Sequence, residues 1–75
     1  MMHIGKIIRQ ELRNQGRTVT WFAKCLYCDR TNVYKIFQRE SVDSELLYRI
    51  SRILSHDFFK YYSRELEEDE GEEEI

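Results

Sequence analysis

The apolar residues of this chain recur at helical spacing in five stretches, and polar or turn-forming residues separate one stretch from the next. In residues 4–14, Ile4, Ile8 and Leu12 repeat along one face while basic and amide side chains occupy another. Gly16 follows this stretch and supplies a helix stop. The pattern therefore predicts an amphipathic helix over residues 4–14.

Two short helices are predicted next, joined by a tight turn. Thr18 can cap the first of them, whose apolar residues recur at i, i+3, i+4 and i+7: Val19, Phe22, Ala23 and Leu26. Asp29 can cap the second, which carries a new apolar stripe: Val33, Ile36 and Phe37. Only about three residues separate the two patterns, so we expect the helices to cross at a steep angle, as in a helix-turn-helix.

A fourth and a fifth helix complete the predicted fold. Asp43 can cap the fourth, Val42 can pack on Leu47, and the stripe is the most regular in the chain: Leu46, Leu47, Ile50, Ile53 and Leu54. Asp57 can cap a short fifth helix with four aromatic residues, which are more than a small core can bury: Phe58, Phe59, Tyr61 and Tyr62. The expected fold class is all-α, a compact domain of five helices.

The helix predicted at about residues 29–38 is polar and basic on the side opposite its apolar stripe. That side carries Arg30, Thr31, Tyr34, Lys35 and Gln38. No acidic residue lies between Arg30 and Arg39, whereas an exposed helix of a small domain commonly mixes acids with bases. A solvated surface is the ordinary interpretation of such a face, but the preceding helix and the short turn favour a helix that reads a DNA groove.

At these residues the chain resembles the lambda-repressor-like, Cro-type helix-turn-helix proteins, also called the XRE family. The resemblance covers about residues 4–62 and depends on Thr18, Ala23, the opening Arg30-Thr31-Asn32-Val33 of the recognition helix, and Leu47, Ile50 and Leu54. It implies a five-helix lambda-repressor-like domain that binds double-stranded DNA sequence-specifically and regulates transcription.

Two residues depart from the pattern of that family. Val19 and Tyr27 stand where the family commonly has Gln and Gly. The Gln often braces against a phosphate or a base, so Val19 removes one family contact. A residue other than glycine in the turn, such as Tyr27, need not adopt the left-handed conformation.

Position along the recognition helix divides the polar residues into two groups. Early residues reach base edges best, and from them we expect base contacts: Arg30, Thr31, Asn32, Tyr34 and Lys35. Flanking residues are expected to meet phosphates, with help from the N–H groups at the start of the preceding helix: Arg17, Thr18, Thr20, Lys24, Gln38 and Arg39. For each flanking residue alone, an ordinary solvated position is an equal alternative. Asn32 also lies partly toward the preceding helix, where its role would be structural.

The charge of the chain is divided between two segments. The net charge of −2 combines 12 Lys and Arg, all within residues 1–64, with 14 acidic residues, eight of them in residues 65–74. Residues 1–64 thus carry twelve basic against six acidic residues, a net of +6, and suit a polyanion. We expect residues 1–64 to form the DNA-binding domain and residues 65–75 to form an acidic, disordered tail.

Neither membrane association nor catalysis is expected. No apolar run approaches the roughly 18 residues that cross a bilayer, and no signal peptide is recognisable, so a cytoplasmic location is predicted. Cys25 and Cys28 form a C-x-x-C without a second pair for zinc, and we expect both to remain reduced. His3 and His56 belong to no nucleophile–base set, so we predict no enzymatic activity, metal, cofactor or small-molecule ligand.

Partners are predicted from the surplus aromatics and from the acidic segment. A single recognition helix reads few base pairs, so we expect a homodimer that pairs through Phe58, Phe59, Tyr61 and Tyr62. The alternative keeps the fold but uses it as a protein-interaction module, such as an antitoxin or adaptor, with the acidic tail as the docking segment.

Overall fold

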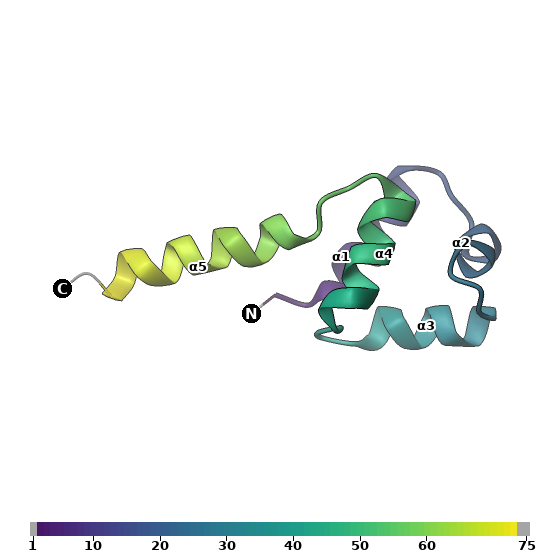
Figure 1. The fold of residues 1–75 in the computed structure, drawn as a ribbon, viewed down its shortest axis with the longest axis horizontal. Helices are drawn as coiled ribbons and strands as arrows, with labels where there is room; N and C mark the ends of the chain where they lie inside the picture. Colours follow the sequence, from purple (N-terminus) through teal and green to yellow (C-terminus); the bar gives the residue numbers. More distant parts are fainter. Residues whose placement is uncertain (1, 74–75) are drawn as a thin grey trace.

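The computed structural model describes the backbone of residues 2–73 and the side chains of residues 2–69 (Figure 1). Within that range the regular structure consists of five helices: α1 (Ile4–Asn14), α2 (Val19–Cys25), α3 (Arg30–Gln38), α4 (Ser44–Leu54) and α5 (Phe59–Glu73). The predicted all-α class with five helices is therefore confirmed. The first four helices begin and end close to their predicted bounds.

Side-chain caps determine where the first four helices begin. Thr18, Asp29 and Asp43 start α2, α3 and α4 as predicted, and each accepts from the backbone N–H three residues later, at 3.0, 2.9 and 2.7 Å. His3 does the same for α1, because its Nδ1 accepts from the backbone N–H of Lys6 at 3.1 Å. Each cap satisfies one of the N–H groups that a helix start leaves without an intrahelical partner.

The turn between α2 and α3 is closed by backbone hydrogen bonds around Tyr27. The N–H of Tyr27 donates to the carbonyl of Lys24 at 3.1 Å, and the N–H of Cys28 donates to the carbonyl of Ala23 at 3.0 Å. This closure holds Tyr27 at φ 57°, so the turn uses the left-handed conformation even without a glycine. The cost is about 1–2 kcal/mol for an L-residue. After this turn, α3 crosses α2 at a steep angle. Figure 1 shows α3 from the side and α2 nearly along its own axis.

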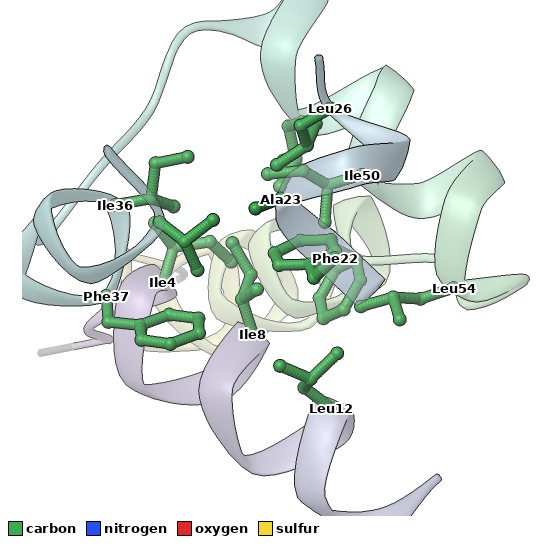
Figure 2. Packing of buried hydrophobic residues seen from close by; sticks show 13 residues of the cluster. Ile4, Ile8, Leu12, Phe22, Ala23, Leu26, Ile36, Phe37, Ile50 and Leu54 are labelled. Carbon is green, nitrogen blue, oxygen red and sulfur yellow. The ribbon is translucent and has the colours of Figure 1, made fainter. Parts of the chain in front are cut away.

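One hydrophobic core joins the first four helices, and Figure 2 shows their side chains converging on it. Phe22 of α2 and Phe37 of α3 stack in it with ring centroids 6.5 Å apart. The core residues, each exposed by 7% or less, are Ile4, Ile8, Leu12, Phe22, Ala23, Leu26, Val33, Ile36, Phe37, Leu47, Ile50, Leu54 and Phe58. The predicted stripes of all four helices therefore face one interior.

α1 crosses the end of α3 at Gly5, where the two backbones touch. The N–H groups of Ile4 and Gly5 donate to the carbonyls of Glu40 and Arg39, each at 3.0 Å. A Cβ at Gly5 would lie 2.4 Å from the carbonyl oxygen of Phe37, so a side chain does not fit there. The contact satisfies two N–H groups of the α1 start and sets its positive end against carbonyls at the end of α3.

α5 is longer than predicted, and in Figure 1 it runs outward from the other four helices. The N–H of Phe59 donates to Asp57 Oδ1 at 3.0 Å, and because α5 begins at Phe59, Asp57 lies one residue outside the cap position that was predicted for it. The structure differs from the predicted disordered tail, because the helix continues through Glu73; Glu74 and Ile75 lie outside the described residues. Once a helix has started, each further residue adds a backbone hydrogen bond, and Glu is a good helix former.

Candidate nucleic-acid interface

The outer face of α3 carries the side chains predicted to read bases. All five are exposed: Arg30, Thr31, Asn32, Tyr34 and Lys35. The opposite side of α3 is anchored in the core by Val33, Ile36 and Phe37. Tyr34, which is 50% exposed, meets the ring of Phe37 edge to face with centroids 6.2 Å apart. The face is therefore presented on a helix that cannot rotate without disrupting the core.

The residues predicted to contact phosphates are also exposed. They lie just before α2, within α2 and at the end of α3: Arg17, Thr18, Thr20, Lys24, Gln38 and Arg39. Arg17 is oriented by the half-buried Trp21, since its guanidinium carbon lies 4.4 Å from the centre of the indole ring. The hydroxyl of Thr18 accepts the capping hydrogen bond of α2 and so lies beside the N–H groups of the helix start.

Two surface hollows flank α3, and sequence reasoning identified neither. The α1–α3 hollow, of about 370 Å³, is lined by His3, Lys6, Arg9, Tyr34, Phe37 and Gln38. The α3–α4 hollow, of about 220 Å³, is lined by Leu26, Cys28, Asn32, Lys35, Ile36, Arg39, Leu46 and Arg49. Neither lining contains a carboxylate, and each brings basic residues of another helix beside the outer face of α3.

Lys6, Arg9 and Arg49 were missed because periodicity alone places them on ordinary polar faces of α1 and α4. Arg49 is held by a hydrogen bond from its guanidinium to the carbonyl of Leu26, at 3.2 Å. Arg9 adjoins α3, because its guanidinium carbon lies 5.9 Å from the centre of the Phe37 ring. Only the crossing of the helices shows that these residues adjoin α3.

The positive charge of the body is not neutralised by internal pairing. Among the described side chains, the single ion pair joins His56 Nδ1 to Glu11 Oε1 at 3.7 Å and involves no Lys or Arg. The net charge of +6 over residues 1–64 therefore remains available to an external polyanion.

Both cysteines are half-buried free thiols. Burial raises the pKa of the Cys28 thiol, the Asp29 carboxylate raises it further, and the Arg49 guanidinium opposes both. Cys28 is consequently a neutral thiol at neutral pH, whereas a nucleophile or metal ligand needs the thiolate. Within the described residues, no group of three or more His, Cys, Asp or Glu is placed to hold a metal ion.

The four aromatics predicted to form a dimer interface lie in different environments. Phe58 is 0% exposed and belongs to the core, so its assignment to a dimer surface is wrong. It precedes α5 and folds back over the body, where its N–H donates to Ser51 Oγ at 3.3 Å. Tyr61 and Tyr62 are half-buried against the core, and Phe59 is 37% exposed.

Comparison of the chain with protein-family models, with curated proteins and with solved structures gives no match. None of the described helices is both long enough and apolar enough to span a membrane.

Proposed function

We propose that this protein is a sequence-specific regulator of the lambda-repressor-like, XRE-family type, which binds double-stranded DNA by placing α3 in the major groove. The observation that carries the proposal is the outer face of α3, where five exposed polar side chains stand on a helix whose other side is buried. The two hollows and the start of α2 add basic residues around that face. Such charge supplies the sequence-independent part of DNA affinity.

Base recognition is assigned to the first two turns of α3. Arg30 and Thr31 lie in the first turn, and Tyr34 and Lys35 lie one turn later on the same outer side. An arginine guanidinium can donate two hydrogen bonds to O6 and N7 of guanine, a pairing that discriminates against other bases by about 1–3 kcal/mol. Asn32 lines the α3–α4 hollow and would approach the groove from that flank.

A single recognition helix reads only a few base pairs, so recognition of a longer DNA site requires a two-fold dimer, with half-sites about 34 Å apart. We assign the dimer contact to one face of α5, where Phe59, Tyr62 and Leu66 follow i, i+3, i+7 spacing and Leu66 is 60% exposed. Antiparallel pairing would set the basic Lys60 and Arg64 of one copy opposite the acidic second half of the other helix. Leu66→Glu should then yield a folded monomer with weakened DNA binding. A dimer that survives this change in sedimentation would place the interface elsewhere, for instance on α1.

The experiment that tests base recognition is a selection of bound duplexes from a random pool, followed by titration of variants on the selected sequence. Arg30→Ala should cost roughly 1–3 kcal/mol of binding free energy and relax the preference at one base position. Arg39→Ala is the matched control, because loss of a phosphate contact weakens all sequences about equally. If Arg30→Ala keeps both affinity and preference in a folded protein, α3 is not the reading element.

A second candidate function is a protein-interaction module such as an antitoxin or adaptor. The observation that favours it is α5, which carries acidic residues outward from the body and could dock on a basic partner (Figure 1). Titration of random duplex DNA across a salt series separates the two functions. A DNA-binding protein loses affinity linearly in a log–log plot as salt rises, whereas an interaction module binds no duplex even at low salt.

A further inference from the structure

The α1–α3 hollow adds a basic site that the α2–α3 pair alone would not provide. We propose that it holds one phosphate of the DNA backbone, with Lys6 and Arg9 of α1 as the charged contacts. The inference builds on the proposed function and extends the DNA-binding surface to a third helix. It also predicts that α1 positions the protein on DNA in addition to packing against α3.

The geometry of the hollow brings its basic groups to the edge of the reading face. Lys6 and Arg9 line one wall, and Tyr34 and Gln38 of the outer face of α3 line the other. The guanidinium carbon of Arg9 lies 5.9 Å from the centre of the Phe37 ring, which also meets Tyr34 with ring centroids 6.2 Å apart. A phosphate in the hollow would therefore lie directly beside a base contact made by α3.

The chemistry of the lining selects an anion. It contains two permanent cations and no carboxylate, so nothing in the hollow competes with phosphate for them. His3 also lines the hollow, and its Nδ1 accepts from the N–H of Lys6 at 3.1 Å. That hydrogen bond places the proton of the neutral ring on Nε2, which makes His3 a further donor. A guanidinium, an ammonium and an imidazole N–H together suit the oxygens of a phosphodiester.

The crossing at Gly5 holds this wall in place. The N–H groups of Ile4 and Gly5 donate to the carbonyls that follow α3, so the first turn of α1 cannot move independently of α3. Lys6 follows immediately in that turn, and Arg9 lies one turn later. The phosphate contact would consequently keep a fixed register with the base contacts, which is how backbone contacts orient a protein on a duplex.

The test uses the full chain and a duplex of random sequence, titrated by fluorescence anisotropy across a salt series. Replacing both residues (Lys6→Gln with Arg9→Gln) should lower the magnitude of the log–log salt slope by about 1, the value for one phosphate. Between 50 and 200 mM salt, the loss of affinity should therefore be about fourfold smaller than in the wild type. Lys6→Gln alone should lower the slope in the same direction. This single change leaves the contact of Arg9 with Phe37 intact, so it keeps the test valid even if the double variant folds poorly.

Two controls distinguish a bound phosphate from a general effect of charge. Arg52→Gln removes one exposed positive charge from the last turn of α4, outside both hollows, and should keep the wild-type slope. Exchanging the two cations (Lys6→Arg with Arg9→Lys) should restore most of the slope. If the double variant keeps the wild-type slope, or Arg52→Gln lowers it equally, the hollow binds no phosphate, while an intact effect of Arg30→Ala would leave the proposed function standing. If the wild type binds no duplex at low salt, both proposals fail.

Discussion

Two regions of this chain are helical for contrasting reasons: the α1–α3 crossing and the second half of α5. At the crossing, Gly5 touches the backbone of α3, and Ile4 and Ile8 beside it are fully buried. In residues 66–73, Leu66 is 60% exposed and the described acidic side chains are exposed as well. The crossing is basic and built from contacts between distant residues, whereas the end of α5 is acidic and has few contacts beyond its own turn.

This contrast shows which part of the molecule can hold a precise surface. The outer face of α3 is fixed because its other side, and the helix that crosses it, are locked into the core. The end of α5 is helical through local propensity alone and makes no described contribution to the core. Groups that must match a rigid duplex therefore lie in the first region, and long-range electrostatic effects are expected from the second.

The largest expected effect lies at the boundary of the two regions, between Phe58 and Phe59. Phe58→Ala should remove about 3–5 kcal/mol of the free energy of unfolding, because it empties a fully buried site. Phe59→Ala should cost less than about 1 kcal/mol, since that ring is already 37% exposed. Urea unfolding of both variants at a concentration where the chain is monomeric measures the difference. Equal losses would contradict the burial of Phe58 and the exposure of Phe59.

The next largest effect concerns the crossing itself. Gly5→Ala should destabilise the fold by about 3 kcal/mol, because the new methyl group would lie 2.4–2.7 Å from three carbonyl oxygens that are part of the backbone. Gly16→Ala is the matched control: it introduces the same methyl group into open space at φ 68° and should cost about 1–2 kcal/mol. Thermal unfolding of the two variants compares their losses of stability. A smaller loss for Gly5→Ala than for Gly16→Ala would contradict the close crossing.

A smaller effect of opposite sign is expected in the turn before α3. Tyr27 is 92% exposed and left-handed at φ 57°, so its ring adds little packing to offset the strain. Tyr27→Gly should stabilise the fold by about 0.5–1 kcal/mol, and Tyr27→Ala should not. An increase in melting temperature for glycine alone would confirm the strain; a decrease for glycine would show that the tyrosine ring stabilises the turn.

The smallest effect on stability is expected from the end of α5. Deleting residues 67–75, which keeps the proposed dimer contact Leu66, should change the free energy of unfolding of the monomer by less than about 0.5 kcal/mol. The deletion should nevertheless tighten binding to random duplex DNA at low salt, because it removes seven acidic residues, and the gain should vanish as salt screens the charge. Circular dichroism and duplex titrations check the two outcomes. A loss of stability above about 1 kcal/mol would show that this segment packs on the body.

Much of the fold could be predicted from sequence, because the apolar stripes and the caps are local signals. Thr18, Asp29 and Asp43 each cap the helix that follows at the predicted residue. The length of α5 could not be predicted in the same way, since a run of acids suits either a solvated coil or a solvated helix. Phe58 was misplaced because spacing alone does not show which of two adjacent aromatics turns inward.

The candidate site was predictable only within a single helix. The outer face of α3 follows from residues 30–38, and the structure exposes each of its predicted base readers. The contributions of Lys6, Arg9 and Arg49 depend on how α1 and α4 cross α3, and no local pattern marks them. Gly5 gave the one available clue to a close crossing, since glycine inside a helix commonly marks close backbone approach or strain.

The most direct test of the central claim is to map DNA contacts by NMR, titrating the isotopically labelled protein with a duplex selected from the random pool. The account predicts that the largest amide shift changes occur in the first two turns of α3 and at the start of α2, with smaller changes near Lys6 and Arg9. Amides beyond Leu66 in α5 should stay unchanged. Changes confined to α5, or no change at saturating duplex, would contradict the claim that α3 reads DNA.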